Sequence, residues 1–299
     1  MSTLSPVSIK TIVIATDLSS TADVAVEQAA ELARRWGASL WMLHVFNDSL
    51  WATVKAIYDS ERWLGNEPVL SAHNRLSQQV REIANRHGIV VTGETRIGSA
   101  AAEVARFLTE HHADLLVVGE HGEDWIGDTV IGGTALKVLK QANVPVLLVR
   151  RPASADFSTV IVATDFSDNA MRAAQLAVNW FPSSSHYLTH AYSVLFEGRM
   201  RMAGATDEDI DRYRVDERMR SEAKMKTLRK LLDIPDATKD HTVNLRGHPA
   251  SALLELSERL AADLIVIGKH GGTAIEERLL GSVTQNVLYH ASSNVLLVP

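Results

Sequence analysis

The chain repeats itself, and this repetition limits what it can fold into more than any other feature. Ala113–Gly122 (ADLLVVGEHG) returns 149 positions later as Ala262–Gly271 (ADLIVIGKHG). Near the start of each half, Thr11–Ser19 (TIVIATDLS) is echoed by Thr159–Ser167 (TVIVATDFS). A period of about 150 residues is the size of a single domain, so the sequence predicts one fold built twice.

Within each half, short apolar runs alternate with stretches of helical period. This alternation predicts βαβ units and a parallel sheet covered on both faces. Five strands per unit favour a doubly wound sheet, where ligands bind beyond the strand C-termini at the point where strand order reverses. We expect the first and fourth strands to be neighbours there. The domains are expected at residues 1–151 and 156–299, joined by a short linker that contains Pro152.

Some local expectations are more specific. Ser20 and Asp23 resemble a capping box at the start of a helix that ends at Gly37. Residues 47–66 carry three aromatic side chains, which we interpret as core or domain contacts: Trp51, Tyr58 and Trp63. The charged stretch 207–230 is expected to form a solvated amphipathic helix. Its apolar stripe would comprise Val215, Met219, Leu228, Leu231 and Leu232.

Composition excludes several classes of protein. The net charge of −6 and the lack of a basic run argue against a nucleic-acid or acidic-membrane binder. The absence of cysteine excludes disulfides and thiol catalysis, and it suits a reducing cytosol. No long uncharged apolar segment is present that would span a bilayer. We therefore expect a cytoplasmic protein with no membrane and no nucleic-acid partner.

The second half contains an apolar run followed by spaced glycines and a serine, and each of these parts suits the binding of an anion. The apolar run before Gly268 reads as a buried parallel strand. Gly268 and Gly271 allow a sharp turn and a close approach of phosphate, since neither residue has a Cβ atom. Gly281 and Ser282 place backbone N–H groups, a hydroxyl and the positive end of a helix dipole at one point. The stretch is therefore a plausible anion cradle.

This spacing, Gly268-x2-Gly271-x9-Gly281-Ser282, resembles the ATP-binding pattern of the universal stress protein family. The resemblance covers both halves and nearly the whole chain. It implies a Rossmann-like fold similar to the adenine nucleotide alpha hydrolases, with two units that pair intramolecularly through their last strands as a pseudo-dimer. It also implies ATP as the ligand, with Mg²⁺ bridging its phosphates, and a stress-response or regulatory role. A further homodimer is left open.

The family's ligand contacts carry over onto the second unit. The resemblance places the adenine beside the ends of the first two strands, the ribose and phosphates on the glycine loop, and the triphosphate on the helix start. In this order the residues are Ala163, Thr164, Asp165 and Ala191; Ile267, Gly268, Lys269, His270 and Gly271; and Gly281, Ser282, Val283 and Thr284. Asp165 could accept a hydrogen bond from the adenine amino group, or it could only cap the following turn.

The first unit departs from this pattern. Gly133 stands where Ser282 stands in the second unit, and Ala135 stands in the place of Thr284. Four carboxylates also occupy its loop, where they would oppose a triphosphate: Glu120, Glu123, Asp124 and Asp128. The hypothesis is that the second unit alone binds ATP well and that the first is mainly structural.

Other chemistry has less support. A metal site of His121 with Asp124 or Asp128 is possible, although loop histidines are usually plain surface residues. His44 and His190, inside the second strand of each unit, are expected to be satisfied core histidines. Three functions remain: an ATP-binding regulator, a slow ATPase, and a scaffold for another metabolite or a protein. Ser282 and Thr284 favour the first two, and the lack of an obvious water-activating carboxylate favours the regulator.

Overall fold

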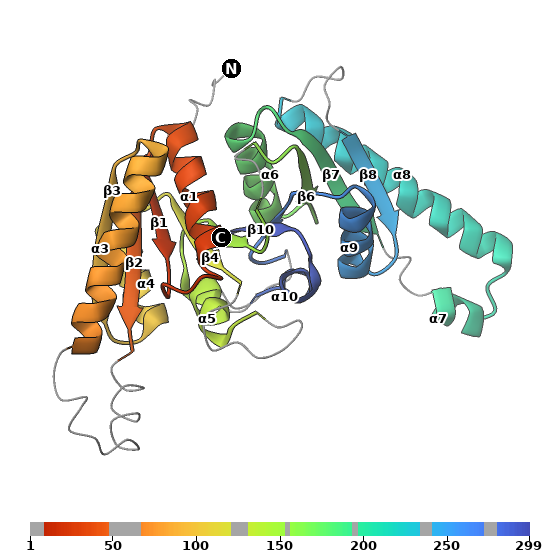
Figure 1. Ribbon diagram of the computed structural model, residues 1–299. Helices are drawn as coiled ribbons and strands as arrows, with labels where there is room; N and C mark the ends of the chain where they lie inside the picture. Colours follow the sequence, from red (N-terminus) through yellow and green to blue (C-terminus); the bar gives the residue numbers. More distant parts are fainter. Residues whose placement is uncertain are drawn as a thin grey trace, which may run out of the picture. The chain divides into compact units, whose positions relative to one another are not determined.

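A computed structural model describes residues 9–47, 67–120, 131–152, 156–192, 197–233, 241–271 and 280–299 of the chain. Contacts between residues divide it into two compact units, one ending at Ala155 and the other beginning at Asp156. In each unit helices connect successive strands along the sequence, so both are α/β folds (Figure 1).

The first unit is built on a five-stranded parallel sheet in the order β3-β2-β1-β4-β5. Its helices pack as two pairs, α1 with α3 and α4 with α5. The strands are β1 (Thr11–Ala15), β2 (Ser39–Phe46), β3 (Val91–Ile97), β4 (Leu115–Gly119) and β5 (Val146–Val149). The helices are α1 (Asp23–Trp36), α3 (Glu67–His87), α4 (Ala100–Glu110) and α5 (Gly133–Gln141).

The second unit repeats this sheet in the order β8-β7-β6-β9-β10, again with parallel neighbours. Helix α9 packs beside α10, and the long α8 lies along β7 and β8 (Figure 1). The strands are β6 (Thr159–Ala163), β7 (Ser185–Tyr192), β8 (His241–Arg246), β9 (Leu264–Gly268) and β10 (Asn294–Val298). The helices are α6 (Asp168–Trp180), α7 (Glu197–Met202), α8 (Asp207–Leu231), α9 (Pro249–Arg259) and α10 (Ser282–His290).

The expected neighbours are found in both sheets. β1 pairs with β4, and β6 pairs with β9 in a register that sets Val160 opposite Leu264. Every residue of β9 and β10 is buried, as apolar strands covered on both faces should be. Strand order reverses between β6 and β9, so the chain segments that follow these two strands meet at one edge of the sheet.

The duplication extends to unusual backbone conformations. Leu18 and Phe166, each following the aspartate after a first strand, both have φ of 66°, a region that residues other than glycine rarely adopt. Nδ1 of His44 lies 2.9 Å from the Thr16 carbonyl oxygen, and Nδ1 of His190 lies 2.8 Å from that of Thr164. Both histidines are half-buried and hydrogen-bonded through Nδ1, so the prediction of satisfied histidines is confirmed for this nitrogen, although neither residue is fully in the core.

One local prediction is wrong and another is only partly correct. α1 has Ala22 as its N-cap without a side-chain cap, because the Ser19 hydroxyl, rather than Ser20, accepts from the Ala22 N–H at 3.2 Å. The expected charged helix is present as α8, and Leu228 of its predicted apolar stripe is buried. Val215, Met219 and Leu231 of that stripe are instead 55%, 62% and 62% exposed. The packed face consists of Ile210, Ser221, Met225 and Leu228. The Ser221 hydroxyl hydrogen-bonds Asn244 of β8 at 2.6 Å, so this polar position is satisfied within the packed face.

Some expectations concern residues outside the described ranges. They are the aromatic residues Trp51, Tyr58 and Trp63, and the acidic loop with His121, Glu123, Asp124 and Asp128. Within the described ranges, no helix is both long enough and apolar enough to cross a bilayer.

Candidate functional site

The candidate site lies where β6 and β9 end. β6 delivers Ala163 and Thr164, both buried, followed by the exposed Asp165. β9 delivers Ile267 and Gly268 and continues into the loop that begins with Lys269. Since the two strands pair in parallel, their ends are neighbours, and the structure brings the adenine-side and loop residues of the sequence prediction together.

Asp165 connects the end of β6 to the glycine loop. Its Oδ1 accepts hydrogen bonds from the Ser167 N–H at 3.0 Å and from the Ser167 hydroxyl. Ser167 in turn caps α6 by accepting from the Ala170 N–H at 3.3 Å. The turn-capping role considered for Asp165 is therefore present. The other carboxylate oxygen faces Gly271, where a Cβ atom would lie only 2.8 Å from it. Gly271 is thus required for this close approach.

The start of α10 is fastened to the same loop. The Gly281 N–H donates to the Lys269 carbonyl at 3.1 Å, and the buried Thr284 hydroxyl donates to the Gly268 carbonyl at 2.9 Å. The single O–H group of Thr284 is therefore already hydrogen-bonded to the protein backbone, and it connects α10 to the end of β9. A direct donation from Thr284 to a ligand phosphate would require this bond to break.

Ser282 is placed differently from Thr284. It is the first residue of α10 and is exposed, and its hydroxyl has no hydrogen-bond partner among the described residues. Gly281, the N-cap, supplies no side-chain cap. The first-turn N–H groups of a helix have no acceptor within the helix. The start of α10 therefore offers a hydroxyl, backbone donors and the positive end of the helix dipole, which together suit an anion.

Lys269 and His270 complete the described part of the loop. Lys269 is only 4% exposed, and its N–H donates to the Val298 carbonyl at 2.6 Å. Burial lowers the pKa of the Lys269 ammonium from its ordinary value. The His270 carbonyl accepts from Nδ2 of Asn169 at 3.3 Å, which attaches the loop to the first turn of α6.

The second strand borders the site. Ala191 is half-buried in β7 and lies beyond Thr189, which pairs with Ala163 of β6. Its neighbour His190 contacts the ring of Phe166, with ring centroids 4.3 Å apart. Nζ of Lys224 in α8 lies over the same Phe166 ring, 5.4 Å from its centroid. The pKa of His190 is lowered, mainly by burial, and Lys224 adds to this effect while Asp165 opposes it.

Sequence reasoning missed Asn169 and Phe166. The positive φ of Phe166 has a signal in the repeated Thr-Asp-x-Ser turn, because the same turn holds Leu18 in the first unit. Asn169 has no such signal. It is an ordinary polar residue of a first helical turn. Its role depends on the close packing of Gly268 against it, since a Cβ atom added at Gly268 would lie 3.3 Å from atoms of Asn169.

The first unit has the same frame with different chemistry. The Gly132 N–H donates to the Glu120 carbonyl at 3.1 Å, as Gly281 donates to Lys269. Glu120 thus stands where Lys269 stands, and its carboxylate pairs with the buried Arg150 at 2.6 Å. Ala135 stands in the place of Thr284, so the first unit lacks the hydrogen bond from this helix position to the end of the fourth strand. The first unit therefore places a carboxylate where the second places an ammonium.

Two tandem doubly wound sheets with a glycine loop at the reversal point define a Rossmann-like α/β protein of duplicated design. The model of the Universal stress protein family matches residues 8–150 and again residues 156–299. The chain therefore belongs to the universal stress protein family, with one copy of the family's domain in each half.

Individual relatives agree with this assignment. A universal stress protein of Mycolicibacterium smegmatis is 27% identical, with 96% of each chain covered. One of Thermus aquaticus is 33% identical over 148 residues, which is 48% of this chain and 98% of that protein. The crystal structure of a universal stress protein from Archaeoglobus fulgidus superimposes with a TM-score of 0.67 at 18% identity, covering 96% of this chain and 97% of that one. This last likeness shows the fold.

Proposed function

We propose that the second unit binds ATP at the edge formed by β6, β9 and the start of α10, and that nucleotide occupancy serves a regulatory role in a stress response. The adenine would lie beside Asp165 and Ala191, and the phosphates beside Gly268–Gly271 and the start of α10. Family membership and the arrangement of these elements support the proposal.

The start of α10 is the observation that carries this proposal. Ser282 presents an exposed hydroxyl with no partner among the described residues, at a helix terminus without a side-chain cap. Two hydrogen bonds, from Gly281 and Thr284, fix this terminus against the glycine loop. A preformed group of donors costs little to organise when an anion binds, which favours affinity. Gly271 has no Cβ atom, so its backbone can lie close to the Asp165 carboxylate.

Mg²⁺ is proposed to enter with the nucleotide. Among the described residues there is no group of three or more His, Cys, Asp or Glu side chains that could hold a metal ion. Mg²⁺ commonly keeps several waters and binds through substrate phosphates with few protein ligands. The phosphates would therefore provide its main ligands, and this chain's residues would hold the phosphates through the hydroxyl and N–H donors of α10.

The test is equilibrium binding of ATP to Ser282→Ala and Ser282→Thr variants. Removal of a hydrogen bond to a charged group costs about 1.5–3 kcal/mol, so the alanine variant should bind ATP at least about tenfold more weakly. The threonine variant keeps the hydroxyl and should bind within a few-fold of the parent. Equal affinity of Ser282→Ala and the parent protein would show that the phosphates do not bind at this helix start.

Gly133→Ser tests the assignment to one unit. A Cβ at Gly133 meets no atom within 4 Å, so the substitution fits. It restores the missing hydroxyl but leaves Glu120 in the place of Lys269, and the binding stoichiometry should therefore remain one ATP per chain. A stoichiometry of two in the parent protein would contradict the assignment. Measurement of phosphate release in the same samples separates binding from slow hydrolysis.

A further inference from the structure

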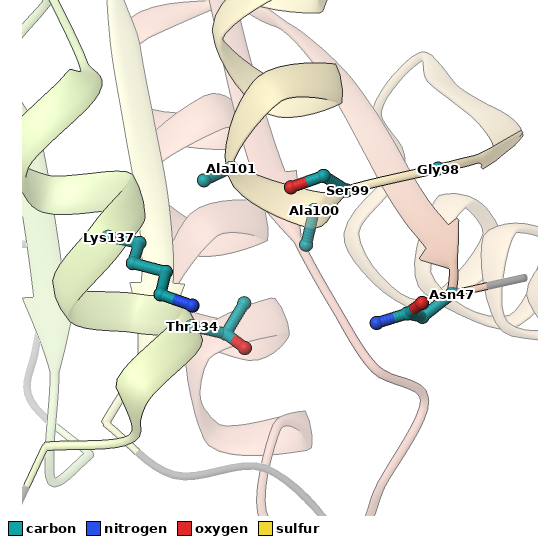
Figure 2. A pocket seen from close by; sticks show the side chains of 7 residues that line it. All are labelled: Asn47, Gly98, Ser99, Ala100, Ala101, Thr134 and Lys137. Atoms are coloured by element: carbon teal, nitrogen blue, oxygen red, sulfur yellow. The ribbon is translucent and has the colours of Figure 1, made fainter. Parts of the chain in front are cut away.

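The first unit contains a pocket of its own, which is independent of the ATP site proposed for the second unit. Its volume is about 450 Å³, within the range of small-molecule sites, about 300–1,000 Å³. It is formed where β2 ends, where α4 begins and along the first two turns of α5 (Figure 2). The lining residues are Asn47, Gly98, Ser99, Ala100, Ala101, Thr134 and Lys137.

The backbone holds the pocket open between these elements. The Gly98 N–H donates to the Phe46 carbonyl at 2.9 Å, which fixes the start of the α4 segment to the end of β2. Gly98 has φ of 144°, a conformation that residues with side chains rarely adopt. Small residues follow, Ala100 and Ala101, and they leave the space between α4 and α5 unfilled.

Polar groups converge on this space. In Figure 2 the ammonium of Lys137, the hydroxyl of Ser99 and the amide of Asn47 point toward it from three different elements. The side chains of Ser99, Thr134 and Lys137 make no hydrogen bond or ion pair with the described residues. Among the described lining residues Lys137 is the only charged one, and none is a carboxylate. The pocket therefore provides one positive charge and several neutral hydrogen-bonding groups.

The second unit does not repeat this chemistry. At the equivalent positions, 149 residues later, it has His248 for Ser99, Pro249 for Ala100, Val283 for Thr134 and Asn286 for Lys137. The ammonium and both hydroxyls are therefore features of the first unit alone. The lining residues of this pocket therefore differ in chemistry from their counterparts in the second unit, which is consistent with a different ligand.

From these observations we infer that the first unit binds a small hydroxylated metabolite that ends in a single phosphate or carboxylate group. The ammonium of Lys137 receives the anionic group, since lysine binds phosphate as a point charge. Asn47, Ser99 and Thr134 exchange hydrogen bonds with the hydroxyl groups. One ammonium among the described lining residues matches one anionic group. A triphosphate is therefore a poor fit.

Calorimetric titration with ribose 5-phosphate tests the inference, with ribose as the uncharged probe, and with gluconate and inorganic phosphate as separate arms. The key variant is Lys137→Asn, which introduces the residue that the second unit carries. The control is Lys140→Asn, which makes the same charge change on α5 outside the pocket lining. Thermal melting of both variants verifies that they fold.

Ribose 5-phosphate or gluconate should bind the parent and Lys140→Asn at least tenfold more tightly than Lys137→Asn, and ribose should bind weakly. The stronger of the two anions identifies the terminal group. The inference is overturned if neither ribose 5-phosphate nor gluconate binds the parent protein, or if they bind Lys137→Asn as tightly as the parent. It is also overturned if inorganic phosphate binds as tightly as ribose 5-phosphate. ATP affinity should be the same in Lys137→Asn and the parent, so the result is independent of the function proposed for the second unit.

Discussion

The hydroxyl of Thr284 donates a 2.9 Å hydrogen bond to the carbonyl oxygen of Gly268, and both residues are buried. The bond joins the first turn of α10 to the last residue of β9. These are the two elements between which the glycine loop runs, so this bond sets the distance between the loop and the helix start that presents Ser282. The first unit, with Ala135 at this position, lacks it.

Replacement of Thr284 by valine should lower the free energy of unfolding by about 1–3 kcal/mol, because a buried carbonyl loses a hydrogen bond. Urea denaturation measures the change. Thr284→Ser keeps the donor and should lose less. If Thr284→Val is as stable as the parent protein, the hydrogen bond to Gly268 makes no net contribution to stability.

Gly271→Ala should disturb the turn after β6. The new Cβ would lie 2.8 Å from Oδ2 of Asp165, so the carboxylate must move. That movement would weaken the bonds from Asp165 to Ser167, which caps α6. Loss of a cap costs about 0.5–2 kcal/mol, measurable as a lower unfolding free energy. We also expect weaker ATP binding, since the loop itself shifts.

Gly133→Ala is the matched control for this substitution. The first-turn position in α5 has open space for a Cβ, and its φ is not positive. Alanine there should stabilise the protein by about 0.4–1 kcal/mol, because it reduces the freedom of the unfolded chain. If Gly271→Ala stabilises the protein to the same degree, the close approach to Asp165 has no energetic consequence.

His190 should titrate below its ordinary pKa, and a histidine NMR titration can measure this. Burial disfavours the charged imidazolium, and Lys224 adds repulsion. The pKa of His190 in the folded state is lower than its unfolded value of about 6.5. At pH values between these two pKa values the unfolded state therefore binds more protons than the folded state. Stability should therefore fall as the pH decreases through this window. Lys224→Met should raise the pKa of His190, and an unchanged pKa would exclude the contribution of that ammonium.

The sequence was sufficient for the fold because its strongest signals are redundant. The repeat of Ala113–Gly122 as Ala262–Gly271 identifies the same strand and loop twice, and both copies end where the doubly wound pattern predicts. The expected pairing of β6 with β9 is confirmed. Helix ends at glycine were also predicted correctly, as at Gly37, which has φ of 64°.

The details that failed depend on tertiary contacts. Val215 and Met219 of α8 look like a packed stripe from their spacing, yet the sheet lies against the face with Ser221 and Met225. The apolar period of a long charged helix does not reveal which face meets the sheet, and Ser221 is buried because Asn244 satisfies its hydroxyl. Likewise, a sequence motif cannot show that the Thr284 hydroxyl is already bound to Gly268.

Asn169 offers a way to separate loop position from protein stability. Its Nδ2 donates to the His270 carbonyl at 3.3 Å, and its Oδ1 accepts from Arg172. Asn169→Asp keeps an acceptor for Arg172 and adds a negative charge near the start of α6, where the helix dipole favours it by about 0.3–1 kcal/mol. The same change removes the donor to His270 and sets a carboxylate against a carbonyl oxygen.

If the glycine loop holds ATP, Asn169→Asp should bind ATP more weakly than the parent while its unfolding free energy is unchanged or slightly higher. Asn169→Ala loses the bond without adding repulsion, so its affinity should lie between the two. Thr21→Asp, at the equivalent position of the first unit, is the matched control and should leave ATP affinity unchanged. Parent-like ATP binding by Asn169→Asp would mean that the His270 carbonyl needs no support from α6, because the two bonds from Gly281 and Thr284 already fix the loop.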